Sequence, residues 1–229
     1  MNRFALGVLA AAGILSLPIP FALAQDFPLT IEHKFGTAII EEKPVRVVSI
    51  DYGGIDNILA LGVEPLVVKQ WRAQDGFAFT AGPWAEPYLT TEPVVLEGDL
   101  DFEAIAEQQP DVIIALYSGI TEADYEKLTL IAPVVAVPKG MGDYALSWDQ
   151  RALIAARALG EEAEATARIE AIDAQLETVR AQHPEWADMT AVGSGKVFPG
   201  PIPTMTCAGS SLRASASSSS ESSVKPLMS

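Results

Sequence analysis

Seven aromatic, hydroxyl and charged side chains stand just after predicted buried strands or in the loops that follow them, which is where open α/β sheets bind ligands. They are Asp51, Tyr52, Trp71, Arg72, Trp84, Tyr117 and Ser118. Arg72 carries a fork of N–H donors that suits anionic oxygen atoms, and the tryptophan and tyrosine rings suit packing against a bulky ligand. The alternative interpretation is structural, because a tryptophan in a long loop often fills a local hydrophobic pocket. We take the set as candidates for ligand binding.

Metal chemistry has few possible ligands in this chain. There is one cysteine, Cys207, so neither an intramolecular disulfide nor a cysteine-based zinc site can form. The two histidines, His33 and His183, are far apart in the sequence, in a predicted hairpin and at a predicted helix end. We therefore expect no metal site and no cofactor. Function must rest on carboxylates, hydroxyls, aromatic rings, arginines or backbone groups.

Catalytic motifs are lacking as well. The nucleophile of a serine hydrolase sits in a G-x-S-x-G turn, and the Gly-Ser-Gly at residues 193–195 does not have that spacing. Asp99 and Asp101 precede a predicted helix, which indicates helix capping rather than an acid–base pair. We expect a binding protein with no catalytic residues. A secreted hydrolase is the alternative from another class, and an esterase or glycosidase screen would test it.

The charge of the chain excludes two further classes of function. The 229 residues include 15 Lys and Arg against 30 Asp and Glu, which gives a net charge of −15. Proteins that coat nucleic acids need clustered cations, and anionic membranes attract basic segments. We expect neither nucleic acid nor a membrane surface as a partner. The hydrophobic content of 49% is enough for most of the chain to fold around a core.

The elements that must position the candidate residues alternate between short strands and short helices over residues 25–148. Apolar and β-branched runs predict a hairpin at 30–40 and strands at 45–50, 65–68, 94–96, 112–116 and 134–137. Helices are predicted at 56–61, 102–108 and 121–130, and an aromatic loop at 69–93. This alternation predicts an α/β lobe with a mostly parallel sheet covered on both faces.

The region 149–190 has a helical character instead. An alanine and leucine stripe at 152–159 ends at Gly160, and residues 161–182 contain neither glycine nor proline. At roughly 1.5 Å per residue, this second helix would be about 33 Å long. From 191 to 229 we expect a single strand and then a disordered tail, because prolines give way to a serine-rich stretch with isolated apolar residues.

Residues 1–24 have the features of a secretory signal peptide. Arg3 supplies a positive charge, residues 4–15 are uncharged and largely apolar, and Ala22-Leu23-Ala24 matches a cleavage site before Gln25. A transmembrane anchor is the alternative, but the apolar stretch is short for a span and ends near two prolines. The residue directly after the cleavage site is Gln25, not a cysteine. We therefore expect a protein exported to the periplasm without a lipid anchor.

Four segments, taken in order, carry a resemblance to a known family. They are FGTAIIEEKPVRVVSIDYGGIDNILALGVEPLVV, DFEAIAEQQPDVIIALYSGI, YEKLTLIAPVVAVP and WDQRALIAARALGEEAEA. Over residues 28–195 the chain resembles the substrate-binding proteins of bacterial iron–siderophore ABC importers, a group related to the cobalamin and haem receptors. No single motif decides the resemblance, which rests on the ordered series.

The resemblance implies a fold of two α/β lobes joined by one long helix, with the ligand held between the lobes. This chain would then contain one lobe (25–148), the inter-lobe helical region (149–190) and a vestigial strand with a tail (191–229), with the second lobe missing. The implied function is capture of a ferric siderophore by a monomeric protein, which delivers it to an ABC transporter permease. Cobalamin and haem are alternative ligands of the same fold.

The implied ligand gives the candidate residues more specific roles. The iron of a ferric siderophore is already coordinated, so the receptor supplies aromatic walls and hydrogen-bond donors. Arg72 would donate to hydroxamate or catecholate oxygens. In the family, a glutamate at the exposed start of one helix docks against arginines of the permease, and Glu103 matches that position. The alternative for Glu103 is an ordinary first-turn glutamate that is favoured by the helix dipole.

The resemblance stops after residues 191–194, and the genetic code suggests a reason. The codons of residues 201–211, read from one nucleotide earlier, can spell Tyr-Thr-Tyr-Asp-Asp-Val-Arg-Gly-Gln-Phe, which resembles the continuation of the family. The ATG codon of Met205, followed by ACN for Thr206, forces an aspartate in that frame. We therefore expect a frameshift near 196–199 and an impaired, truncated protein. A natural serine-rich tail is the alternative.

Overall fold

The computed structural model describes residues 26–71, 77–186, 191–193 and 196–198. The expected signal peptide at 1–24, the candidate Arg72 and the serine-rich segment at 210–223 lie outside these residues. Within the described ranges, no helix combines the length and the apolar character needed to cross a membrane.

Five parallel strands form the central sheet, in the order β5-β4-β3-β6-β7. Their bounds are Val47–Ser49 for β3, Pro65–Lys69 for β4, Val94–Leu96 for β5, Val112–Ala115 for β6 and Val134–Ala136 for β7. The first strand of the sheet, β3, lies at its centre and pairs with β4 and β6. Apolar and β-branched residues dominate because helices bury both faces. The predicted α/β lobe with a parallel sheet is confirmed.

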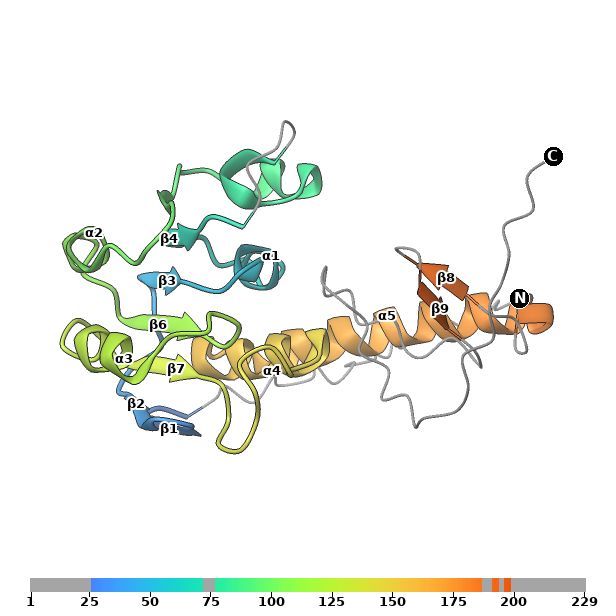
Figure 1. The fold of residues 1–229 in the computed structure, drawn as a ribbon. Coiled ribbons are helices and arrows are strands. Elements are labelled where there is room, and N and C mark those ends of the chain that lie inside the picture. The colour runs from blue at the N-terminus through green and yellow to red at the C-terminus, as the bar shows by residue number, and fades with distance from the viewer. Residues whose placement is uncertain (1–25, 72–76, 187–190, 194–195, 199–229) are drawn as a thin grey trace, which may run out of the picture.

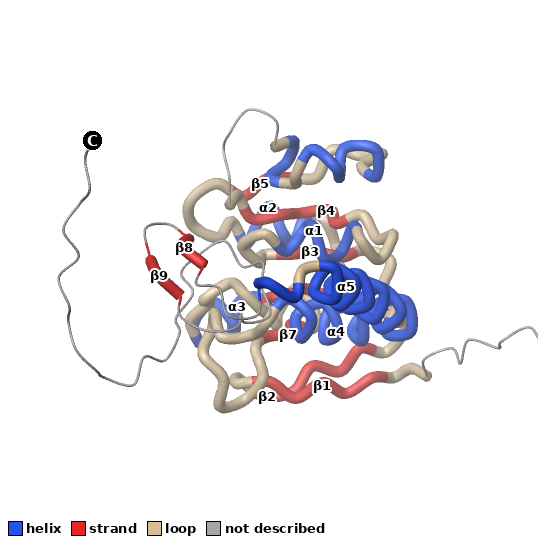
Figure 2. Tube along the Cα trace, turned by 90° about the vertical axis from the view of Figure 1, so that its right-hand side faces the viewer, coloured by secondary structure: helices blue, strands red, loops and turns tan. Residues whose placement is uncertain are grey.

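Helices cover the two faces of the sheet in separate layers (Figure 1). On one face lie α2 (Phe102–Glu107) and α3 (Glu122–Leu128), and on the other lie α1 (Gly54–Leu59) and α4 (Trp148–Leu159). Figure 2 looks onto the second face, with α1 and α4 in front of the strands. The order of layers is therefore helix, sheet, helix.

Successive residues of each strand enter two different cores, because side chains alternate across a sheet. In β3, Val47 packs in the core on the α1 and α4 side, and Val48 packs in the core beneath α2 and α3. Leu159 belongs to the first core, and Ile105 and Leu128 belong to the second. All five side chains are fully buried. The sheet is thus held from both sides and presents only its edges to ligands.

The helices α2 and α3 begin where the sequence places their caps. The Asp101 carboxylate accepts a hydrogen bond from the N–H of Ala104 at 3.0 Å. Thr121 and Asp124 cap reciprocally: Thr121 Oγ1 accepts from the Asp124 N–H at 3.2 Å, and Asp124 accepts from the Thr121 N–H at 3.0 Å. The capping role predicted for Asp101 is confirmed, whereas Asp99 lines a cavity that is described below.

One long helix, α5 (Glu162–Gln182), leaves the α4 side of the lobe, as predicted (Figure 1). Gly160 ends α4 with a φ of +72°, which suits glycine at this turn. Beyond α5, β8 (Ala191–Gly193) pairs in antiparallel fashion with β9 (Lys196–Phe198). The sequence predicts a strand at 191–194 and irregular chain from 197 on. The strand β9 therefore differs from this prediction.

Other differences from the sequence-based prediction are local. The helix expected at 56–61 is α1, which begins at Gly54 because Gly53 takes a φ of +71° and turns the chain into the helix. The loop expected at 69–93 contains two 3-10 turns, η1 (Ala78–Thr80) and η2 (Pro83–Tyr88). The expected hairpin is confirmed as β1 (Leu29–His33) and β2 (Gly36–Ile40).

Asp111 joins the start of β6 to the chain that enters β3. Its Oδ2 accepts hydrogen bonds from the N–H groups of Val45 at 2.8 Å and Arg46 at 2.7 Å. Its own N–H donates to the Arg46 carbonyl at 2.8 Å. These contacts lie immediately before the two strands pair, so they fix the register of the central strands.

We predict that Asp111→Ala lowers the free energy of unfolding by about 1–2 kcal/mol, because two backbone donors lose a charged acceptor. Urea denaturation followed by circular dichroism measures the change. Asp111→Asn keeps one acceptor oxygen and should lose less. An alanine variant as stable as the wild type would contradict this role.

Candidate functional site

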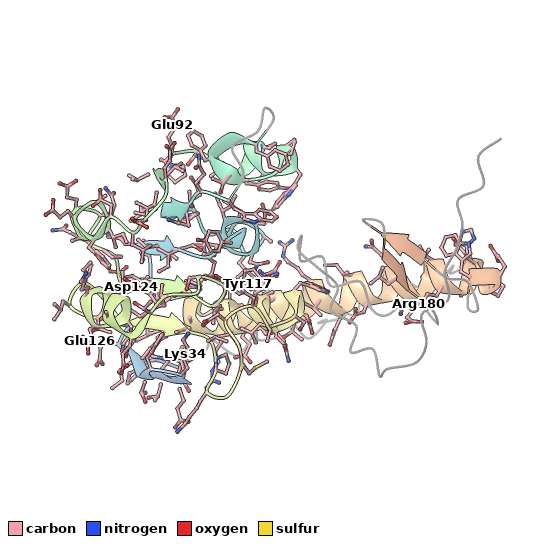
Figure 3. All side chains as sticks on the ribbon, viewed as in Figure 1. Lys34, Glu92, Tyr117, Asp124, Glu126 and Arg180 are labelled. Carbon is pink, nitrogen blue, oxygen red and sulfur yellow. The ribbon has the colours of Figure 1, made fainter. Side chains whose placement is uncertain are left out.

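The loops that follow β3, β4, β5 and β6 meet at the carboxyl edge of the sheet around a cavity of about 300 Å³. It lies between this edge and the first turns of α2 and α3, and Figure 3 labels Asp124 on α3 and Tyr117 after β6. The residues that line it are Ile50, Tyr52, Lys69, Gly98, Asp99, Leu100, Phe102, Ser118, Gly119, Ile120 and Asp124. Two sequence-predicted candidates, Tyr52 and Ser118, are therefore brought together here.

Asp51 ties the loop after β3 to the loop after β6. Its side chain is 3% exposed, and its Oδ1 accepts a hydrogen bond from the Tyr117 N–H at 2.7 Å. The N–H of Tyr52 donates to the Tyr117 carbonyl at 3.2 Å. These two hydrogen bonds set the position of Tyr117 relative to β3. Asp51 is thus placed to hold a neighbouring residue rather than to face solvent.

Burial raises the pKa of Asp51 to about 6, because a desolvated carboxylate disfavours its charged form. The hydrogen bond from the Tyr117 N–H and the charge of Arg151 oppose this rise. Arg151 itself lies on α4 and is 7% exposed. Asp51 is therefore close to its midpoint of protonation in mildly acidic solution.

The Tyr117 ring is held between a cation and a second aromatic ring. The Arg151 guanidinium carbon lies 4.4 Å from its centroid, and Tyr144 meets it edge-on at 4.9 Å between centroids. The Tyr144 hydroxyl packs against Gly119, where a β-carbon would collide with it and where φ is +66°. Tyr144 is 55% exposed, so this aromatic group reaches the surface. The sequence did not indicate Arg151 or Tyr144.

The two tryptophan candidates occupy different places. Trp71 is half-buried against the loop after β3: a β-carbon on Gly53 would lie 3.4 Å from its Cε3. Trp84 lies on η2, is 49% exposed and packs against Tyr88 with ring centroids 6.1 Å apart. Neither tryptophan lines the cavity. Trp71 is at the carboxyl edge with Tyr52 and Tyr117, whereas Trp84 belongs to a separate exposed pair.

Lys69, which the sequence analysis missed, is the buried cation of the cavity. It is the last residue of β4, is 6% exposed and lines the cavity. Within the part of the chain that the structure describes, its Nζ has no hydrogen-bond partner. A signal was present in the sequence, because Lys69 is the one charged residue in the apolar strand PLVVK and stands at its carboxyl end.

Glu103 is exposed in the first turn of α2, beside the Asp101 cap.

Among the described residues, no group of three or more His, Cys, Asp and Glu side chains is arranged to hold a metal ion. His33 is buried in β1, where burial lowers its pKa, and His183 follows α5. The site is therefore built from aromatic rings, hydroxyls, one lysine and buried charges.

A family model described as periplasmic binding protein matches residues 47–206. The chain belongs to the periplasmic binding protein family. This family consists of binding proteins rather than enzymes, and the resemblance predicted from the ordered sequence segments is confirmed. The match begins at β3 and contains the strands whose carboxyl ends form the cavity.

Several relatives of this periplasmic binding protein have names that mention iron chelates. The chain is 34% identical over 122 residues to the probable siderophore-binding lipoprotein YfiY of Bacillus subtilis, covering 50% of this chain and 34% of YfiY. It is 27% identical over 195 residues to the Fe(3+) dicitrate-binding periplasmic protein FecB of Escherichia coli, covering 83% of this chain and 60% of FecB.

A solved structure is also similar to this chain. Streptococcus pneumoniae PiaA in complex with ferrichrome is similar with a TM-score of 0.60 and 34% sequence identity, covering 69% of this chain and 53% of PiaA. The chain spans about half the length of the relatives that it matches. Together with the one parallel sheet of the described residues, this coverage is consistent with one lobe of the family fold.

We predict that Asp51 makes the stability of the lobe fall as the pH rises from about 4 to about 6. The pKa of Asp51 is raised from 3.8 to about 6 in the folded chain, so in this window the folded state binds a proton that the unfolded state has released. The stabilising effect is complete below the unfolded pKa and is lost above the folded one. Asp51→Asn removes this titration but keeps an acceptor for the Tyr117 N–H.

The stability of Asp51→Asn relative to the wild type should therefore rise by roughly 2.5 kcal/mol between pH 4 and pH 7. Urea denaturation at several pH values measures this difference. Asp173→Asn, on the exposed surface of α5, is the matched control for the loss of one carboxylate. A difference between Asp51→Asn and the wild type that does not change with pH would exclude titration of Asp51.

Proposed function

We propose that this chain carries the ligand-binding lobe of an ABC importer's solute-binding protein and that the captured ligand is a ferric siderophore. The observation that carries the proposal is the match of the lobe to proteins whose names specify siderophore or ferric dicitrate binding. The similarity to PiaA in complex with ferrichrome supports the same ligand class. Export to the periplasm and delivery of the ligand to a membrane permease are parts of this proposal.

The carboxyl edge of the sheet supplies the contacts that such a ligand needs. Tyr52 and the half-buried Trp71 give aromatic surface, and Ser118 gives a hydroxyl at the cavity, whereas the Tyr117 ring is buried next to them. Arg72 follows directly after Trp71 and is proposed as a donor to ligand oxygens. Asp51 contributes by holding Tyr117 through its N–H, and Trp84 contributes from the exposed side of the loop.

We predict that the chain binds ferric chelates and that Trp71→Ala weakens this binding about tenfold, because an aromatic contact is lost. Isothermal titration calorimetry with ferric hydroxamates, ferric catecholates and ferric dicitrate measures the affinity. Trp186→Ala, at the far end of α5, is the control. Tight binding of cobalamin or haemin, with no binding of the ferric chelates, would replace the siderophore by the alternative ligands of this fold.

We predict that this chain binds a ferric siderophore more weakly than the frame-restored protein, in which the expected frameshift near 196–199 is corrected. One lobe contacts one side of the ligand, and a loss of about 4 kcal/mol of contacts corresponds to roughly a thousandfold in the dissociation constant. The same titrations on both versions measure the ratio. Equal dissociation constants would show that this lobe alone supplies the affinity.

Glu103 is proposed as the contact with the permease, because it is exposed in the first turn of α2. We predict that Glu103→Arg, made in the frame-restored protein, reduces siderophore uptake through the permease and leaves ligand affinity unchanged, since a cation there would repel the arginines of the permease. Uptake of labelled iron and calorimetry measure the two quantities. Glu126→Arg, exposed on α3, is the control. An equal loss of ligand affinity would place Glu103 in the binding site.

A further inference from the structure

Lys69 is buried, and its side-chain nitrogen has no hydrogen-bond partner among the described residues. The main chain is fixed by the parallel pairing of β4 with β5, in which Lys69 is opposite Leu96, and the Lys69 carbonyl accepts from Thr80 Oγ1 at 3.4 Å. The side chain is 6% exposed, and its Nζ finds no hydrogen-bond acceptor among the residues that the structure describes. A buried cation without an acceptor costs stability. This cost is removed when a ligand supplies an acceptor.

The cavity next to Lys69 is large enough for such a ligand. Its volume of about 300 Å³ is at the lower end of the range for small-molecule sites, so it suits a small molecule or one arm of a larger one. Tyr52 and Ser118 line the same cavity, and the Ser118 hydroxyl donates to the Ala115 carbonyl at 3.2 Å. An acceptor that enters here therefore meets Lys69 as its cation, with Tyr52 beside it.

The charges in the lining narrow the class of the acceptor. Lys69 shares the cavity with two carboxylates, Asp99 and Asp124. Asp124 is already bound by the N–H and the hydroxyl of Thr121, at 3.0 and 2.7 Å. Two nearby carboxylates oppose a phosphate, because all of its charge enters the cavity on one small group, whereas a larger ligand inserts a single carboxylate beside the single ammonium and keeps its other charges outside the cavity. A hydroxyl next to that carboxylate would find acceptors in the same lining.

We propose that Lys69 binds a carboxylate of the ligand in this cavity, and that the ferric chelate carried by this lobe is therefore of the hydroxycarboxylate class. The class of the ferric chelate rests on the proposed function, since it assumes that the ligand binds at the carboxyl edge of the sheet. The binding of a carboxylate by Lys69 depends only on the cavity. Lys69 gives the negatively charged chain a point of attachment for an anion at this edge.

The test uses iron-free citrate as the probe, with inorganic phosphate at equal ionic strength for comparison. Calorimetry is performed on the wild type, on Lys69→Met and on Lys139→Met, which removes an exposed lysine beyond β7. Citrate should bind the wild type and Lys139→Met equally, and Lys69→Met at least about tenfold more weakly. Phosphate should bind the wild type more weakly than citrate.

Without citrate, Lys69→Met should melt at least about 3 °C higher than the wild type, because a buried cation has been removed.

A measurement on the wild type alone covers the case in which Lys69→Met fails to fold. In spectra of the lysine Cε and Nζ groups, the Lys69 signals should shift saturably with citrate and those of Lys139 should not. Absence of a saturable citrate effect in the wild type, or equal citrate affinity of Lys69→Met, overturns the proposal. Lys69-dependent binding of phosphate as tight as that of citrate overturns the carboxylate class. If citrate binds through Lys69 but no ferric chelate binds, the proposed function fails and the carboxylate site stands.

Discussion

Parallel pairing of β3 with β6 is the constraint on which the site depends. The two strands run in register from Val47 opposite Val112 to Ser49 opposite Ile114, so both end at the same edge. The chain must then leave both strands at neighbouring points. Asp51 and Tyr117 occupy these exits and bind each other through a carboxylate and an N–H. The cavity exists because β4 and β5 end at this edge too.

Buried charge is concentrated at this edge of a chain whose net charge is −15. Asp51, Lys69 and Arg151 are 3%, 6% and 7% exposed, and charged groups in such positions destabilise a fold unless they are paired. Only Asp51 has a hydrogen bond from a neighbouring loop, whereas within the described residues Lys69 Nζ and Arg151 Nε have none. Stability is therefore lowered at the site where a ligand is proposed to bind, and the apolar clusters on both faces of the sheet offset this loss.

The elements of the lobe were predictable because their signals are local. Apolar runs identify the strands, and Asp101 and Thr121 identify the starts of α2 and α3 through their own side chains. The cavity was only half predictable. Tyr52 and Ser118 follow strands and were found by position, whereas Lys69 is inside a strand and was passed over. Arg151 and Tyr144 come from segments distant in sequence, and only the folded chain brings them against Tyr117.

The shape of α5 gives small packing changes at its base a large effect at its far end. Of its 21 residues, Ala165 is the buried one, and the start of the helix is joined to the lobe by the ion pair of Lys43 with Glu161 at 2.6 Å. At 1.5 Å per residue the helix extends about 31 Å, so a tilt of about 5° at its base moves its tip by about 3 Å. The helix is a lever arm whose angle is set within its first turn. A bulkier side chain at Ala165 would therefore move the far end of α5, at Gln182, without touching it.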